Sequence, residues 1–228
     1  MKVPVMIQLY LDHESGVRPL ESKLLVKRTF SSIVDGSPFD LPLDSDSDTA
    51  FYGRVGEDVP IQEMIDRMIT WSSNLATNLL IEVADAKRVT RTVRGLGADS
   101  MEVLRGVEDL KAFRAGLSNT TTARDLGLVM GAVAEGTLLS AASREQMLDI
   151  LQRQHFRDNI PAGLPRGTAV ANKTGWITGI NHDAAIVFPD SAEPYVLVVM
   201  LRGHPAEDGG AAFAAGLSRI VWEYHVGR

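Results

Sequence analysis

The sequence predicts an α+β protein in which helices come first and an antiparallel sheet comes late. Apolar residues recur at helical spacing in several segments of residues 1–165, and three short apolar segments separated by turn residues follow within residues 166–228. Helices followed by a hairpin-rich sheet and a closing helix are typical of α+β architecture. We expect a single domain over 1–228, with a helical lobe over about 1–165 and the sheet with its terminal helix over about 166–228.

The first helix is expected over residues 3–13, where Pro4 suits a first helical turn because its missing N–H has no partner there anyway. Residues 29–56 are rich in Ser, Asp, Pro and Gly and predict an irregular region. The acidic run within it, residues 44–48, lacks the Gly and Glu that a calcium loop needs at its sixth and twelfth positions. We therefore expect a solvated acidic loop.

The later elements follow from periodicity and turn signals. Helices are expected over 60–85 with a break at 71–74, after Thr122, over 140–151 and over 210–224. Strands are expected over 168–174, 183–188 and 195–202. Because residues 185–188 and 195–201 are almost continuously apolar, we expect these two strands to be buried on both faces.

Composition excludes several classes of function. The net charge of −6 and the pI of about 5.4 argue against nucleic acid or an anionic membrane as the partner. The absence of Cys excludes disulfides, thiolate metal sites and a thiol nucleophile. No stretch reaches the roughly 18 apolar residues that a membrane span requires. The five His residues show no metal-ligand spacing, so we expect neither a metal nor a cofactor.

Three short strings carry the functional signal, although each is commonplace alone. They are Lys2, the string Ser72-Ser73-Asn74, and the string Lys173-Thr174-Gly175. Their order and spacing resemble the serine β-lactamase and penicillin-binding protein superfamily, in particular its class A-like branch, whose signature is Ser-x-x-Lys, Ser-Asp-Asn and Lys-Thr-Gly. The flanking sequence agrees over essentially the whole chain, including Met68–Leu80 around the second string and Trp176–Phe188 after the third.

The resemblance implies a β-lactamase/transpeptidase-like fold and assigns catalytic roles. Lys2 is the amine that activates a serine, Ser72 passes a proton to the leaving nitrogen, and Lys173 supplies positive potential. Asn74 holds the amide side chain of the substrate, and Thr174 binds its carboxylate.

Further substrate contacts are implied beyond the third string. Gly175 ends the string and Trp176 follows it, and the backbone N–H of Trp176 forms half of an oxyanion hole. His182 falls near the position of an arginine that binds the substrate carboxylate, a role that it fills only when protonated. A structural His beside Asp183 is the alternative.

Two departures from the family pattern concern the serine motifs. Ser73 stands where the family has Asp, and no lysine of this sequence has a Ser three residues before it. The serine preceding Lys2 would lie two residues upstream of Met1. We therefore expect a shortened version of a longer protein, catalytically inactive as given, whose upstream reading frame supplies that serine.

The family fold also has two strands before the serine. Without them the strand over 195–201 becomes a sheet edge, and an apolar edge predicts self-association. The family usually acts in the periplasm or outside the cell, but residues 1–16 do not read as an export signal, so localisation stays open.

Glu108 is the candidate base for deacylation, because class A enzymes carry a Glu on the Ω-loop and the corresponding region here is 105–111. The usual Glu-x-x-Leu-Asn string is absent. The alternative is a surface carboxylate paired with Arg105 or Lys111, in which case water attack on an acyl-enzyme is slow.

The sequence thus predicts a serine β-lactamase-like hydrolase acting through an acyl-enzyme on a small molecule, either a β-lactam or a D-alanyl peptide or ester. Two alternatives stay open. One is a penicillin-binding protein of the D-alanyl-D-alanine peptidase or esterase kind. The other is a binding module that keeps the carboxylate-binding cleft without covalent chemistry.

Overall fold

The computed structural model describes residues 1–177, 179–203 and 207–227, which fall into two compact units. The first unit comprises residues 1–122 and the second residues 123–228. The first contains α1 (Lys2–Glu14), β1 (Lys23–Leu25), β2 (Thr29–Ser31), β3 (Pro38–Asp40), η1 (Leu43–Ser45), η2 (Thr49–Arg54), β4 (Asp58–Pro60), α2 (Ile61–Thr70), α3 (Asn74–Ala84), α4 (Ala86–Gly95) and α5 (Leu110–Arg114).

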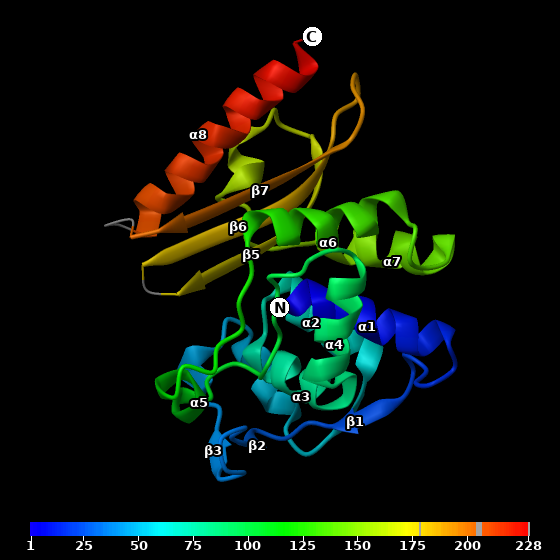
Figure 1. The fold of residues 1–228 in the computed structure, drawn as a ribbon, viewed down its shortest axis with the longest axis vertical. Coiled ribbons are helices and arrows are strands. Elements are labelled where there is room, and N and C mark those ends of the chain that lie inside the picture. The colour runs from blue at the N-terminus through cyan, green and yellow to red at the C-terminus, as the bar shows by residue number, and fades with distance from the viewer. Residues whose placement is uncertain (178, 204–206, 228) are drawn as a thin grey trace. The chain divides into compact units, whose positions relative to one another are not determined.

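Helix α1 is the central element of the first unit and packs against α2, α3 and α4 (Figure 1). All its residues from Val3 to Tyr10 are buried, so it presents no solvent-facing stripe over this stretch. The predicted helix is confirmed, with Pro4 in the first turn. This burial fixes the start of the helix, and therefore Lys2, relative to its neighbours.

The predicted break between α2 and α3 is confirmed. Helix α2 ends at Thr70, and α3 begins at Asn74 after its N-cap residue Ser73, whose hydroxyl accepts a hydrogen bond from the Ala76 N–H at 3.2 Å. Ser72 has a φ of 58°, in the left-handed region that a residue with a Cβ avoids. The chain therefore turns sharply at the second sequence motif.

The region expected to be irregular contains ordered short elements. Strands β2 and β3 form a ladder, and β1 pairs with β4. The prediction of a solvated acidic loop over residues 44–48 is wrong for two of its carboxylates. Asp46 and Asp48 are 7% and 4% exposed, and Asp48 pairs with the Arg67 guanidinium at 3.0 Å. A buried carboxylate is retained only with partners such as these.

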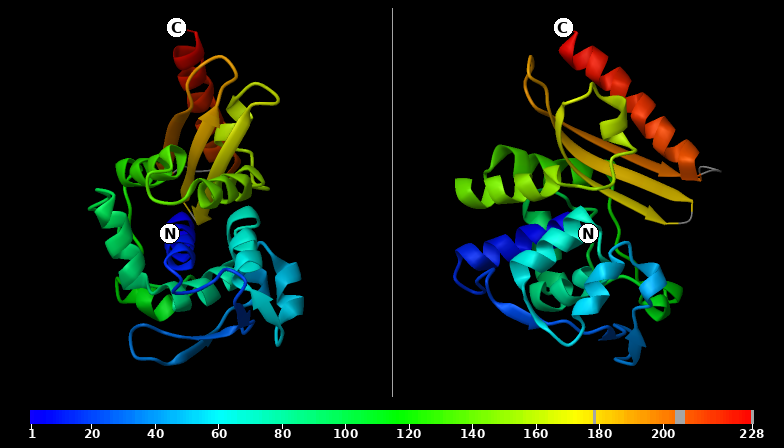
Figure 2. Two further views of the ribbon diagram at one scale, coloured as in Figure 1. Left: turned by 90° about the vertical axis from the view of Figure 1, so that its right-hand side faces the viewer. Right: turned by 180° about the vertical axis from the view of Figure 1, so that it is seen from behind.

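The second unit is a three-stranded antiparallel sheet between helices. It contains α6 (Ala123–Glu135), α7 (Ala141–Gln152), η3 (Ile160–Gly163), β5 (Ala169–Ile177), β6 (Ile180–Phe188), β7 (Tyr195–Arg202) and α8 (Glu207–Val226). The strand order is β5-β6-β7. Helices α6 and α7 cover one face of this sheet and α8 covers the other (Figures 1 and 2).

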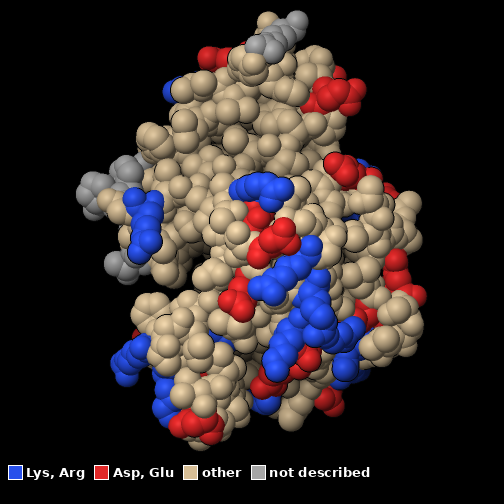
Figure 3. Space-filling view, in the orientation of Figure 1, with Lys and Arg blue, Asp and Glu red and all other residues tan. Residues whose placement is uncertain are grey.

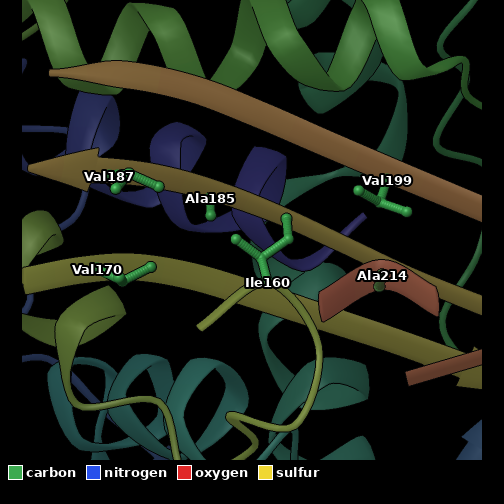
Figure 4. Close-up of a cluster of buried hydrophobic side chains, with 6 residues drawn as sticks. All are labelled: Ile160, Val170, Ala185, Val187, Val199 and Ala214. Carbon is green, nitrogen blue, oxygen red and sulfur yellow. The ribbon is translucent and has the colours of Figure 1, made fainter. Parts of the chain in front are cut away.

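The core of the second unit lies between the sheet and α8 (Figure 4). Alternation along each strand directs every second side chain to this face. The buried cluster consists of Ile160, Val170, Ala185, Val187, Val199 and Ala214. This packing holds β5 and β6 in register, with Lys173 opposite Ala184 and Thr174 opposite Asp183.

The α+β class and the three predicted strands are confirmed, with two differences. Strands β5 and β6 are longer than expected, so the Lys-Thr-Gly string lies inside β5 and not at its end. Burial of the 195–202 strand on both faces is also wrong, because only Val199 of β7 is fully buried. In the described chain β7 has a hydrogen-bonded neighbour, β6, on one side only, which agrees with the predicted edge.

The charged surface shows no large area of one sign on the face drawn in Figure 3, where Lys and Arg side chains lie beside Asp and Glu. Several opposite charges of the described residues form ion pairs, such as those of Arg54 with Glu57 and of Lys111 with Asp35. None of the helices in the described residues combines the length and apolar character needed to cross a membrane.

Candidate active site

Lys2 lies against the turn that separates α2 from α3, in the first unit. Its Nζ is 2.5 Å from the Ser72 carbonyl oxygen, 3.0 Å from Ser72 Oγ and 3.1 Å from Asn74 Oδ1. These contacts connect the first residue of α1 with residues 70 and 72 positions further along the chain. Two of the three sequence motifs therefore meet within one unit.

The partners of Lys2 differ in what they can donate. A carbonyl oxygen and an amide oxygen only accept hydrogen bonds, whereas a hydroxyl both accepts and donates. Once Lys2 loses a proton, its two remaining N–H bonds can still serve Ser72 O and Asn74 Oδ1. Its lone pair is then left facing the Ser72 hydroxyl, which is the contact that allows proton exchange.

The protonation of Lys2 is tuned by its surroundings. Burial lowers the pKa of the Lys2 amine to about 8, while the Asp46 carboxylate acts in the opposite direction. At pH 7 an amine with this pKa is about one-tenth neutral, compared with well under one-thousandth for an ordinary lysine. A lysine poised in this range can serve as a base.

Asn74 is oriented by a residue that the sequence motifs did not include. Its Nδ2 donates to the Ser45 carbonyl oxygen at 2.7 Å, which turns Oδ1 toward Lys2. Asp46, the next residue, accepts from the Leu75 N–H at 2.8 Å. The acidic run over residues 44–48 is visible in the sequence. Nothing in that run indicates that Asp46 is buried beside the second motif.

Glu108 lies in a segment of the first unit that Asn78 holds by its backbone. Asn78 Nδ2 donates to the Val107 carbonyl at 3.0 Å, and Asn78 Oδ1 accepts from the Val107 N–H at 2.6 Å. Glu108 itself has a left-handed φ of 61°. Arg105 donates to backbone carbonyls and Lys111 pairs with Asp35, so the pairing proposed as the alternative role for Glu108 is not formed by these contacts.

The third motif lies on β5 in the second unit. Lys173 and Thr174 are 8% and 9% exposed, and Lys173 Nζ donates to the Thr174 carbonyl at 2.7 Å. Gly175 stands opposite His182 on β6. Burial lowers the pKa of His182 below its ordinary value, which favours a neutral imidazole at pH 7. Trp176 follows on β5 and is 63% exposed.

A cluster of buried polar groups lies beside β5 and is centred on Asp183. Asp183 is 1% exposed, and its carboxylate accepts from Asn172 Nδ2 at 3.1 and 3.3 Å and from the Ile160 N–H at 3.1 Å. Burial raises the pKa of Asp183 to about 6, although these hydrogen bonds and Lys173 act against the shift. Asp183 therefore ties η3 to the strand pair that carries Lys173 and Thr174.

The structure thus gathers the predicted residues in two groups, each within one unit. Lys2, Ser72 and Asn74 are in direct contact in the first, where Glu108 also lies. Lys173, Thr174, Gly175, Trp176 and His182 share two adjacent strands in the second. Among residues 1–177, 179–203 and 207–227, no group of three or more His, Asp or Glu side chains is arranged to hold a metal ion.

Comparison with a family model and with known proteins finds β-lactamases as relatives of this chain. The model of the Beta-lactamase enzyme family matches residues 1–225. A β-lactamase from Streptomyces fradiae is 29% identical over 175 residues, covering 75% of this chain and 57% of that protein. A β-lactamase from Bacillus licheniformis is 30% identical over 151 residues, covering 64% of this chain and 49% of that protein. The matched part spans about half the length of these relatives.

Solved structures show the fold. The structure of PBP-A has a TM-score of 0.81 and 26% identity, and the match covers 98% of this chain and 78% of that one. TLA-1 extended-spectrum β-lactamase, at 20% identity, also gives a TM-score of 0.81 over 98% of this chain and 82% of that one, which is a likeness of fold.

The fold and the residue groups define an α+β protein of the β-lactamase/transpeptidase class, with a helical part and a small antiparallel sheet. The extent of the family match then fixes the membership. The chain belongs to the Beta-lactamase enzyme family.

Proposed function

We propose that this chain carries the lysine, proton-shuttle and carboxylate-binding parts of a serine β-lactamase-like hydrolase. The observation that carries the proposal is the contact of Lys2 Nζ with both Ser72 Oγ and Asn74 Oδ1. A lysine with a lowered pKa, held against a hydroxyl, is what activation of a serine requires. The function assigned to the whole protein therefore depends on a serine three residues before Lys2.

The chemistry follows from these contacts. Neutral Lys2 takes the proton of that serine as its oxygen attacks the β-lactam carbonyl carbon. The bond between this carbon and the lactam nitrogen breaks, and the nitrogen receives a proton from the Ser72 hydroxyl, which Lys2 replenishes. Asn74 donates to or accepts from the amide side chain of the substrate. The product of this half-reaction is an acyl-enzyme.

The second unit supplies the anion-binding part of the proposed site. Thr174 binds the substrate carboxylate and Lys173 adds positive potential, with Gly175 leaving the strand edge open. The Trp176 N–H donates to the developing oxyanion. Because burial favours neutral His182, it would contribute a hydrogen bond and not a charge at pH 7.

Deacylation is assigned to water activated by Glu108. Its left-handed φ is supported by the hold of Asn78 on the adjacent residue Val107. In the form extended upstream with the serine, Glu108→Gln should lengthen the lifetime of an acyl adduct at least about tenfold, since a general base contributes at least that much. Glu102→Gln in the same extended form is the matched control and should leave the lifetime unchanged. Equal lifetimes in all three proteins would remove Glu108 from the mechanism.

A second candidate is a penicillin-binding protein that deacylates slowly. The missing Glu-x-x-Leu-Asn string favours it, as does the 26% identity with PBP-A. A mutant of PBP-A has been solved as an acyl-enzyme complex with penicillin G. Turnover of penicillin against a long-lived adduct separates the two candidates.

Non-covalent binding tests the proposed site in the 228-residue chain itself. Benzylpenicillin titrated into the labelled protein should shift the NMR signals of Asn74 and Thr174. Asn74→Ala and Thr174→Val should each weaken binding several-fold, while Thr121→Val should not. Binding that is unaffected by both substitutions would contradict the roles proposed for Asn74 and Thr174. Binding without acylation in any extended form would favour the non-catalytic module.

A further inference from the structure

Asp46 lies at the centre of the contacts that form the second motif. It follows η1, and its carboxylate is buried although it belongs to an acidic surface run. Its Oδ2 accepts from the Leu75 N–H at 2.8 Å and from Ser73 Oγ at 3.3 Å, while Oδ1 accepts from the Asp48 N–H at 2.9 Å. One carboxylate thus joins the loop to the start of α3.

The start of α3 explains why a carboxylate is needed there. The first N–H groups of a helix have no partner within the helix. Ser73 Oγ accepts a hydrogen bond from the Ala76 N–H, and the Asp46 carboxylate accepts one from the Leu75 N–H. A negative charge at this end is also favoured by the helix dipole. Asp46 therefore completes a cap that Ser73 alone leaves incomplete.

The same loop segment fixes the motif side chains. The Ser45 carbonyl holds Asn74 Nδ2, so Asn74 Oδ1 faces Lys2. The left-handed turn at Ser72 lies between Lys2 and the Asp46-bound helix start. Strain of this kind persists only when neighbouring contacts hold it.

We propose that Asp46 is a positioning residue that replaces, from a distant loop, the carboxylate missing at Ser73. In the family string Ser-Asp-Asn the carboxylate belongs to the motif itself, whereas this chain has Ser73 there and Asp46 hydrogen-bonded to it, 27 residues earlier. The exchange keeps a carboxylate against Ser73 and Leu75, the residues on either side of Asn74. Its catalytic relevance rests on the function proposed above, but its structural and electrostatic parts do not.

The electrostatic part is measurable at Lys2. Asp46 counteracts the burial that lowers the pKa of the Lys2 amine to about 8. The charge of Asp46 also reaches Tyr52, where burial and then this carboxylate raise the pKa of the hydroxyl. An uncharged hydrogen-bonding group at this position would cap the helix without this effect on the two titrations.

The test is a titration of Lys2, followed by NMR of 13C-labelled lysine side chains in the 228-residue protein and assigned with Lys2→Arg. Asp46→Asn should lower the Lys2 pKa by at least about 0.5. Adding Ser73→Asp to that variant should raise the Lys2 pKa most of the way back to its value in the parent protein. Asp48→Asn, which removes the nearby carboxylate paired with Arg67, is the control and should leave the Lys2 pKa unchanged.

The outcomes separate the alternatives. A Lys2 pKa unchanged in Asp46→Asn, or moved equally by Asp48→Asn, would overturn the proposal. Where Asp46→Asn does not fold, the double variant Asp46→Asn with Ser73→Asp decides the question, because a carboxylate at residue 73 should restore folding and a Lys2 pKa close to that of the parent protein. A double variant that stays unfolded, or that folds with a clearly lower Lys2 pKa, would overturn the exchangeability of the two positions. If these shifts occur but no extended form of the protein is acylated, the Asp46 assignment stands and the proposed function fails.

Discussion

The Asn78 side chain forms two hydrogen bonds with the backbone of Val107. Its Oδ1 accepts from the Val107 N–H at 2.6 Å, and its Nδ2 donates to the Val107 carbonyl oxygen at 3.0 Å. Gly106, the residue before Val107, leaves room for this approach. A Cβ at that position would lie 2.2 Å from Asn78 Oδ1. The segment that presents Glu108 is therefore held by one amide side chain and one glycine.

Gly106→Ala should displace Asn78 and leave its buried amide, and the half-buried Val107 peptide groups, without their partners. We expect a loss of about 1–3 kcal/mol in the free energy of unfolding, which is typical of an unsatisfied buried polar group. Gly53→Ala is the control, because nothing lies within 4 Å of a Cβ there. Urea denaturation measures both, and equal stability of the two variants would argue against the clamp.

The turn at Ser72 predicts an unusual order of stabilities. A φ of 58° is tolerated by Gly but strained for Ala, at a cost of about 1–2 kcal/mol. Ser72→Gly should therefore be more stable than Ser72→Ala by about 1 kcal/mol, although both lose the hydroxyl that contacts Lys2. If thermal unfolding ranks Ala above Gly, Ser72 does not adopt this conformation in solution.

Asp183 predicts a pH dependence of stability. Its pKa is raised to about 6 in the folded protein, above the 3.8 expected when unfolded, so the folded state holds this proton more tightly. The contribution of Asp183 to the free energy of unfolding is complete below pH 4 and is lost as the pH rises through 6. This loss amounts to at most about 3 kcal/mol. Asp183→Asn should flatten this part of the profile.

The control for that profile is Asp149→Asn, which removes an exposed carboxylate paired with Arg153 at the end of α7. It should keep the slope of the parent protein between pH 4 and 6. Chemical denaturation at each pH gives the comparison. A slope that persists in Asp183→Asn would show that other groups cause it.

The edge position of β7 predicts self-association of the 228-residue protein. Its molar mass by light scattering should rise with concentration, and amide hydrogens of β7 should exchange more slowly in the concentrated sample. Amides of α4 serve as the internal control. A constant monomer mass, with β7 exchange independent of concentration, would mean that this edge does not pair with a second copy.

Much of the fold was predictable because its elements are long and periodic. The helical spacing around α1, α2 and α3 and the apolar runs of β6 and β7 identify them directly. The three-residue strands β1 to β4 were not identified, because pairing with distant segments and not local pattern defines them. The partial exposure of β7 depends on which elements pack against it. A run of apolar residues does not predict those neighbours.

The site was predictable where a motif is contiguous and not where a contact is distant. The family spacing selected both Lys2 and Ser72 as site residues, and their side chains are in contact. Asp46 was missed because its role depends on the fold bringing a surface-like acidic run against Leu75, 29 residues away. The buried support of Asp183 under β5 likewise arises from cross-strand register.

The most direct test of the central claim is the intact mass of three polypeptides after incubation with benzylpenicillin. One is the 228-residue chain, one is extended upstream with a Ser three residues before Lys2, and one has Ala at that added position. The account predicts one covalent penicillin on the Ser form, lost on Lys2→Met, and none on the other two. Labelling that is equal in the Ser and Ala forms, or unaffected by Lys2→Met, would contradict it.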